Sequence, residues 1–412
     1  MLINESTLEF IRRHADDDVR LLALHGTKDN AVNMTMALQQ IAGRQTARRK
    51  LPSWAATDNI VYPPHLNMEQ CSSEQTARYK ARVAGKGDTL VDLTGGFGVD
   101  FYWMSQGFQE RIYVERNADL CAIMKANMAT LGHSCQVNQG DTSAYLATIT
   151  HASVIYLDPA RRNEHGSRTY DIADCTPNVL EPLPLLIAKA DKIILKLSPM
   201  LDWRKSVEDI EHTKTLPQAH VTEVHIVSVD NECKELLLVI SQEQTESLRL
   251  VCVNNEQEFV TIQNQQTTHL KPTNSAPEAS EFPSPLYLYE PNASVMKAGC
   301  FDELTQRYQV SPVAPNSHLF LSSVEIADFP GRKFQISSIS SMNKKDVKQT
   351  LSEIFGHQEA PLKRANISVR NFPLSADALR QRLQLKDGGD IYIIATTLAN
   401  GQHRLFFCRK IG

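Results

Sequence analysis

The stretch "LVDLTGGFGVD", residues 90–100, ends an apolar run in an acid and then passes through three glycines into a helical pattern. Asp92 closes the apolar run, and Gly95, Gly96 and Gly98 follow it. Glycines let the backbone approach a ligand closely, and the amino end of the next helix favours a negative group. Many glycine-rich turns are only tight connections between a strand and a helix. The motif alone is therefore weak evidence for a binding site.

Strands and helices alternate around this stretch, from residue 88 onward. The expected strands are TLVDL (89–93), RIYVE (111–115), CQVNQ (135–139), VIYLD (154–158), KIILKLS (192–198), VTEVHIVSV (221–229) and ELLLVI (235–240). Alternation of this kind predicts an α/β fold, with a parallel sheet covered by helices on both faces. The last two strands are separated by DNECK, which is too short for a crossover, so they are predicted to form an antiparallel hairpin.

Acidic residues end four successive strands of this predicted sheet: Asp92, Glu115, Asp141 and Asp158. Open α/β sheets bind their ligands at the carboxyl edge, where these side chains would meet. Glu115 follows the glycines by about twenty residues, where an acid can accept both hydroxyl groups of a ribose. Helix capping would explain one or two of the four acids. Four in succession favour a ligand site.

The arrangement resembles the class I S-adenosylmethionine-dependent methyltransferases over residues 70 to about 243, including the terminal hairpin, and implies their Rossmann-like sheet and their cofactor. In that superfamily the first acid and the glycines hold the methionine part, the second acid binds ribose and the third binds adenine. Thr94 stands where many members have the first glycine. The expected cofactor-binding residues are Asp92, Thr94, Gly95, Gly96, Gly98, Glu115, Asp141 and Asp158.

Further motifs resemble a bacterial methyltransferase family with a C-terminal THUMP-like domain, whose catalytic domain is grouped with the RNA cap guanine-N2 methyltransferases. These motifs are QCSSEQTA (70–77), LDPARR (157–162), KLSPMLD (196–202), NECKELL (231–237), YEPN (289–292), FPGR (329–332) and RNFPL (370–374). The resemblance implies an N-terminal helical domain (1–75), a cofactor-binding domain (76–262), a linker (263–284), a small ferredoxin-like domain (285–330) and an α+β THUMP-like domain (331–412).

The segment Asp158-Pro159-Ala160-Arg161 departs from the motif of enzymes that methylate exocyclic amines. Those enzymes carry Asp, Asn or Ser, then two prolines and an aromatic residue that stacks on the base. Asp158 and Pro159 keep the first half and are expected to hold the acceptor amine. The planar Arg161 could stack on a base or hold a phosphate, and it could equally pair with Asp158 or Asp92 and only fix the loop.

The fifth predicted strand contributes Lys196, the last of the expected catalytic residues after Asp158, Pro159 and Arg161. Lys196 is predicted to contact substrate or phosphate, although a lysine whose stem packs on apolar surface is the alternative. The segment also resembles the DPPR motif of uracil-C5 methyltransferases. Those enzymes need a cysteine nucleophile at the end of the fifth strand, where this chain has Ser198, so that route is disfavoured.

Charge is distributed unevenly along the chain. From Gly331 to the end there are 14 Lys and Arg against 6 Asp and Glu, a balance of +8, and the preceding residues carry −12. A basic module predicts a polyanion partner, here structured RNA such as tRNA or rRNA, although a solvated basic face explains the charge equally well. The candidate phosphate contacts are Lys344, Lys345, Lys363, Arg364, Arg370, Arg380 and Arg382.

Three local patterns give narrower expectations. Leu8, Ile11, Ala15, Val19 and Leu22 share one face of a predicted N-terminal helix. Ser72 and Gln75 have the spacing of a capping box before the first strand. In NECKELL, the charged residues Glu232, Lys234 and Glu235 are expected to pair within the hairpin, or alternatively to line the mouth of the pocket.

Composition excludes several classes of protein. There is no apolar run of membrane-spanning length and no signal-peptide core. The eight cysteines include no CxxC pair, which disfavours a metal site and suits a reducing cytoplasm. We therefore expect a cytoplasmic S-adenosylmethionine-dependent methyltransferase that modifies a base nitrogen in structured RNA. The alternatives are a small-molecule or protein methyltransferase, and an RNA-binding protein that retains the cofactor without turnover.

Overall fold

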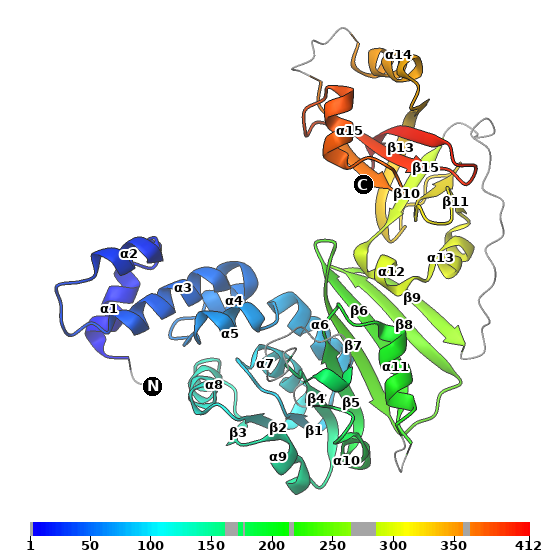
Figure 1. Cartoon of the computed structure of the whole chain (residues 1–412). Coiled ribbons are helices and arrows are strands. Elements are labelled where there is room, and N and C mark those ends of the chain that lie inside the picture. The colour runs from blue at the N-terminus through cyan, green and yellow to red at the C-terminus, as the bar shows by residue number, and fades with distance from the viewer. Residues whose placement is uncertain (1–2, 161–171, 176–177, 214–217, 265–285, 357–362) are drawn as a thin grey trace. The chain divides into compact units, whose positions relative to one another are not determined.

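The computed structural model describes residues 3–160, 172–175, 178–213, 218–264, 286–356 and 363–412. The chain divides into two compact units, which are coloured along the sequence in Figure 1. The first unit contains residues 1–229 and 234–249, and the second contains residues 230–233 and 250–412. No helix in these described ranges is long and apolar enough to cross a membrane.

The first unit begins with helices. They are α1 (Glu5–Arg13), α2 (Val19–His25), α3 (Met34–Lys50), α4 (Pro52–Ala55), α5 (His65–Gln70) and α6 (Glu74–Ala84). The expectation of one continuous first helix was wrong, because the Asp18 side chain accepts hydrogen bonds from Arg20 N and Leu21 N and starts α2 as a separate helix. The predicted capping box was displaced by one residue, because Ser73, rather than Ser72, caps α6 by accepting from Thr76 N.

The sheet of the first unit confirms the predicted topology. Its strands are β1 (Gly87–Asp92), β2 (Phe108–Glu115), β3 (Gln136–Gln139), β4 (Ala152–Leu157), β5 (Ala190–Leu197), β6 (His220–Val229) and β7 (Glu232–Ser241). Their order is β3-β2-β1-β4-β5-β7-β6, and the sheet continues beyond β6 with β8 (Ser247–Asn254) and β9 (Gln257–Asn264) (Figure 1). The first five are parallel, and β7 returns antiparallel to β5 as the hairpin expectation required.

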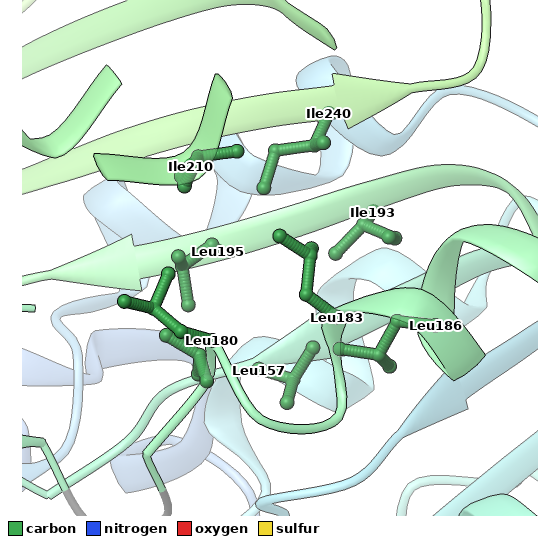
Figure 2. Close-up of a pocket in the computed structure, with 9 residues that line it drawn as sticks. Leu157, Leu180, Leu183, Leu186, Ile193, Leu195, Ile210 and Ile240 are labelled. Atoms are coloured by element: carbon green, nitrogen blue, oxygen red, sulfur yellow. The ribbon is translucent and has the colours of Figure 1, made fainter. Parts of the chain in front are cut away.

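Alternating residues on these strands bury two faces. On one face Tyr156 packs with Phe101 of α7 (Val99–Ser105) and Met124 of α8 (Ala118–Thr130). On the other face Leu157 lies near residues of α10 (Leu183–Lys189) and α11 (Trp203–Glu211), as Figure 2 shows. Every side chain lining that second region is aliphatic. It is therefore packed core and offers no polar group to a ligand.

The second unit contains a separate seven-stranded sheet. The strands and helices of this part of the chain are β10 (Tyr287–Pro291), α12 (Ala293–Ala298), α13 (Phe301–Tyr308), β11 (Ser311–Pro312), β12 (Phe320–Ser322), β13 (Gly331–Ser341), α14 (Lys344–Phe355), β14 (Asn366–Arg370), α15 (Ala376–Leu383), β15 (Ile391–Thr397) and β16 (His403–Lys410). The order is β11-β12-β10-β13-β16-β15-β14. Most of the expected linker, residues 265–284, lies outside the described residues.

One buried carboxylate joins distant parts of this second sheet. Glu290 on β10 is 2% exposed and forms ion pairs with Arg332 of β13 and Arg370 of β14. β10 and β14 are separated by three strands in the sheet order. The motifs YEPN, FPGR and RNFPL therefore meet at one interaction.

The glycine turn after β1 generates a prediction for stability. A Cβ atom at Gly95 would lie 2.1 Å from the Tyr113 ring, which is buried, whereas a Cβ at Gly140 would meet nothing within 4 Å. We expect Gly95→Ala to lower the free energy of unfolding by about 1–3 kcal/mol through overpacking. Gly140→Ala is the matched control and should change it little. Thermal unfolding of the two variants tests this, and equal stability of both would contradict the proposed steric role of Gly95.

Candidate active site

The four predicted acids lie along the carboxyl edge of the sheet. Asp92 and Glu115 end β1 and β2, Asp141 follows β3, and Asp158 follows β4. Burial, reinforced by the nearby charges of Asp100, Asp158 and Glu115, raises the pKa of Asp92 well above its ordinary value. Glu115 and Asp158 are thus both close enough to Asp92 to influence its ionisation.

Thr94 connects the ends of two neighbouring strands. Its backbone N donates to Asp92 Oδ1 at 2.9 Å, and its hydroxyl Oγ1 accepts from the Asp158 backbone N at 2.6 Å. A glycine in this position could not make the second bond. The departure from the family's first glycine therefore couples the turn after β1 to the loop that carries Asp158.

Glu115 holds the glycine turn. Its Oε2 accepts from Gly96 N at 2.9 Å, and its Oε1 accepts from Asn117 N at 2.8 Å. Gly96 has φ +56°, a backbone conformation that favours glycine, and a Cβ there would meet Thr94 O at an ordinary contact distance of 3.8 Å. Gly98 differs: it has φ +82°, and its Cβ would lie 2.3 Å from Met124 Sδ, so packing requires that glycine.

Asp141 has a structural role in the folded chain. Its Oδ1 accepts from Ser143 N at 2.8 Å and caps α9 (Thr142–Thr148). Capping was the alternative explanation considered for one or two of the four acids. The residue nevertheless stands on the same edge of the sheet as Glu115, because β3 pairs in parallel with β2.

Asp158 and Lys196 form an ion pair at the end of β4. Lys196 Nζ lies 2.5 Å from Asp158 Oδ2, and the lysine side chain is 7% exposed while that of Asp158 is 37% exposed. Burial alone would lower the pKa of Lys196, but the charges of Asp158, Asp100 and Glu235 raise it above its ordinary value. Lys196 is therefore a buried ammonium rather than a lysine reaching for solvent.

The remaining residues of the predicted catalytic segment are only partly described. Pro159 is buried and Ala160 is exposed. Arg161 lies outside the described residues, so both roles considered for its guanidinium stay predictions. Ser198, which stands where the uracil-C5 enzymes need cysteine, is 7% exposed, and its Oγ accepts from Met200 N at 3.3 Å.

Sequence reasoning missed the side chains behind Lys196. Lys80 of α6 is fully buried, binds both carboxylate oxygens of Glu235 at 2.6 Å and lies 3.2 Å from Asp100 Oδ1. Glu235 is thus paired with α6, and the expectation that it pairs within its own hairpin was wrong. The spacing in the sequence could have revealed Lys80. It lies three residues after Ala77 and four before Ala84, which places it on the same face of α6 as these two buried residues.

The predicted RNA contacts differ in what surrounds them. Arg370 is paired with Glu290, and Arg380 is paired with both Asp377 and Asp387. The remaining candidates have the following exposure: Lys344, Lys345, Arg364 and Arg382 are exposed, and Lys363 is half-buried. Within the described ranges, no group of three or more His, Cys, Asp or Glu side chains is arranged to hold a metal ion.

The raised pKa of Asp92 predicts how stability depends on pH. An acid whose pKa is raised on folding costs stability as pH increases from its unfolded pKa to its folded pKa, because unfolding then releases a proton. Asp92→Asn keeps an acceptor for Thr94 N and cannot ionise. We expect this variant to gain stability relative to the wild type as pH rises from about 5 to about 8.

Thermal midpoints of the full chain across that pH range measure the effect. Asp88→Asn, at an exposed position of the same strand, is the matched control and should follow the wild type. A stability difference for Asp92→Asn that stays constant or shrinks with rising pH would contradict the assignment.

Comparison with known proteins places this geometry in a family. Residues 287–330 match a ferredoxin-like domain, and residues 331–410 match a THUMP domain-like family. An S-adenosylmethionine-dependent methyltransferase of Mycobacterium tuberculosis, itself uncharacterized, is 21% identical over 349 residues, which cover 84% of this chain and 86% of that protein. The crystal structure of a putative methyltransferase from Porphyromonas gingivalis is 32% identical, covers 100% of both chains and superposes with a TM-score of 0.82.

The similarity to the Porphyromonas gingivalis protein extends from the N-terminal helices through the last strand. Together with the acidic carboxyl edge and the two C-terminal domain matches, it settles the assignment. The chain belongs to a family of class I S-adenosylmethionine-dependent methyltransferases that carry a C-terminal THUMP-like domain.

Proposed function

We propose that this methyltransferase modifies a base nitrogen in structured RNA, such as tRNA or rRNA, in the cytoplasm. The observation that carries the proposal is the side chain of Asp158, a partly exposed carboxylate at the end of β4 that Lys196 holds in place. The THUMP-like match and the +8 charge of residues 331–412 support RNA as the substrate. None of the eight cysteines, which all lie in the described residues, forms a disulfide, and this suits the proposed location.

The acidic residues along the carboxyl edge of the sheet, which we call the rim, fit S-adenosylmethionine. The carboxyl group of Asp92 lies near those of Glu115 and Asp158, and this acidic surface suits a group that carries a sulfonium and an ammonium better than the pyrophosphate of a dinucleotide. Gly96, which carries no side chain, lets a ligand approach the backbone of the turn beside them. We assign the methionine part to Asp92 and the glycine turn, with Thr94, Gly95 and Gly98 shaping that turn. Glu115 would hold the ribose, and Asp141 would lie nearest the adenine.

The chemistry follows from the charge states of the chain's own side chains. The bound cofactor supplies an electrophilic methyl group, so the protein has to orient and desolvate the acceptor. Asp158 can accept an N–H of the acceptor amine and direct its lone pair. Lys196 remains an ammonium and cannot take the amine's proton. The partly exposed Asp158 carboxylate can accept that proton and pass it to water.

The C-terminal module would deliver the RNA. The exposed side chains of Lys344 and Lys345 lie in the first turn of α14, and Arg382 is exposed on α15. Lys363 and Arg364 precede β14. We propose these five as phosphate contacts, with Arg370 and Arg380 as weaker candidates because each already has a carboxylate partner.

Two other functions use the same geometry. An enzyme acting on a small molecule or a protein would keep the cofactor site and show no salt-dependent affinity for RNA, because it would release no counterions from phosphates. An RNA-binding protein without turnover would bind both RNA and cofactor but transfer no methyl group. RNA affinity and methyl transfer therefore have to be measured separately.

Transfer of labelled methyl groups to RNA tests the proposal directly. We expect the full chain to transfer label from S-adenosylmethionine to RNA isolated from a strain that lacks this gene, and much less to RNA from the parent strain, whose acceptor base is already methylated. Digestion to nucleosides would identify the base that carries the label. Protein that binds S-adenosylhomocysteine but labels neither RNA sample would contradict the proposed substrate.

Substitutions in the rim should separate cofactor binding from transfer. Glu115→Ala should weaken S-adenosylhomocysteine binding by about tenfold or more, because a hydrogen bond to a charged group contributes about 1.5–3 kcal/mol. Asp158→Ala should leave that binding nearly unchanged and reduce transfer by on the order of 10²-fold or more, because the acceptor loses its alignment. Calorimetry and single-turnover assays measure the two quantities.

Glu115→Gln is the control for the loop, because it keeps an acceptor for Gly96 N while it removes the charge. Its affinity should fall between those of the wild type and Glu115→Ala. Equal loss of cofactor binding in Glu115→Ala and Asp158→Ala would show that Asp158 maintains the structure of the rim instead of orienting an acceptor.

A further inference from the structure

A chain of alternating charges runs beneath the proposed acceptor site. It links Glu235 on β7, Lys80 on α6, Asp100 on α7, Lys196 on β5 and Asp158 after β4. Successive partners are separated by 2.6, 3.2, 3.8 and 2.5 Å. Each charge thus lies next to a charge of the opposite sign, and the five residues come from five different segments of the sequence.

The exposed fraction of the side chains changes abruptly at one end of this series of charges. The side chains of the first four members are at most 10% exposed, whereas that of Asp158 is 37% exposed. With all members ionised, three carboxylates and two ammonium groups leave one excess negative charge. Water reaches the chain mainly at Asp158, so that carboxylate is where an external hydrogen-bond donor can approach.

Asp100 is the junction of the chain. Its Oδ2 accepts hydrogen bonds from Ser72 Oγ and Tyr156 OH, both at 2.8 Å, and lies 3.8 Å from Lys196 Nζ. Its Oδ1 is 3.2 Å from Lys80 Nζ, an ion pair without the angle of a hydrogen bond. These contacts fix the carboxylate of Asp100 on both sides. It therefore presents a fixed negative charge behind the Lys196 ammonium.

Stability alone accounts poorly for so many buried charges. Replacing a buried ion pair by apolar side chains of similar size is often neutral or stabilising, because desolvation offsets the attraction. A fixed geometry is what such a network supplies when every member is paired. In this protein the series of paired charges ends at Asp158, the group proposed to hold the acceptor.

We propose that Asp100, backed by Lys80 and Glu235, is a positioning residue for methyl transfer, because it fixes the Lys196 ammonium against Asp158 and so fixes the direction of the Asp158 carboxylate. Asp100 contacts neither acceptor nor reacting atoms. The inference rests on the proposed role of Asp158, and it extends that role to a buried network in the protein core. It does not depend on whether the acceptor is RNA.

The expected result is a loss of turnover without a loss of cofactor affinity. Asp100→Asn should reduce the single-turnover rate by on the order of 10²-fold, since misplacement of a reacting group by about 1 Å can cost that much. Its affinity for S-adenosylhomocysteine should match the wild type by calorimetry. The double variant Asp100→Asn/Lys196→Met should lose no more activity than Lys196→Met, because Asp100 acts through Lys196.

Controls separate positioning from folding. Glu74→Gln removes the charge of another buried carboxylate in the same part of the protein. Glu74 binds Ser53 and Arg78 and is not a member of the series of alternating charges, so this variant should keep the wild-type rate. Tyr156→Phe deletes a single hydrogen bond to Asp100 and preserves every charge, so it tests the idea even if Asp100→Asn unfolds. It should lower the rate in the same direction by a smaller factor. Thermal midpoints of all variants report on folding.

Three results from the variants would overturn the inference. The first is a wild-type rate in both Asp100→Asn and Tyr156→Phe. The second is a double variant in which the rate losses of Asp100→Asn and Lys196→Met multiply. The third is a loss of cofactor affinity in Asp100→Asn as large as its loss of rate. The assay is run on the RNA, protein and small-molecule fractions of the deletion strain. Label in a fraction other than RNA rejects the proposed substrate. The same variants are then assayed on that fraction, and their rates decide the positioning role. Label in no fraction overturns both proposals.

Discussion

The burial of two lysine side chains beneath one edge of the sheet constrains the whole first unit. An ammonium group in the core is tolerated only with carboxylate partners, because its desolvation would otherwise cost several kcal/mol. Lys80 and Lys196 share Asp100 between them, so helices α6 and α7 must dock where β4, β5 and β7 bring their own charged groups. The requirement to pair these charges thus fixes both the helix packing and the geometry at the rim.

Periodicity explains why the sheet and its rim could be predicted from the sequence. Apolar strands that alternate with helical segments gave the five parallel strands and the closing hairpin, and acids at the strand ends marked the edge on which they meet. The partners of those acids could not be predicted in the same way. Lys80 and Glu235 are 155 residues apart, and their contact exists only because the hairpin lies against α6. For Glu235, the expectation of a local pair failed for this reason.

Two helix boundaries differ from the expected ones, each for its own physical reason. Ser72 and Ser73 have equal intrinsic ability to cap α6, but Ser72 donates to the buried Asp100, so Ser73 takes the cap. A tertiary hydrogen bond therefore decided between two neighbouring positions. The first helix divided because Asp18 satisfies backbone N–H groups that a continuous helix would have paired internally. Local patterns identified both regions, while distant or competing contacts fixed their boundaries.

The second unit shows that residues which characterise a family need not carry chemistry. Three of its family motifs converge on Glu290, a buried carboxylate between Arg332 and Arg370, where the sheet is held together. The charge of Arg370 is thereby paired within the protein, and that of Arg380 is paired with two aspartates. Net charge overstates the basic surface that a polyanion could use. For the proposed RNA substrate, attraction would have to come from exposed basic side chains such as those in the first turn of α14, Arg364 and Arg382.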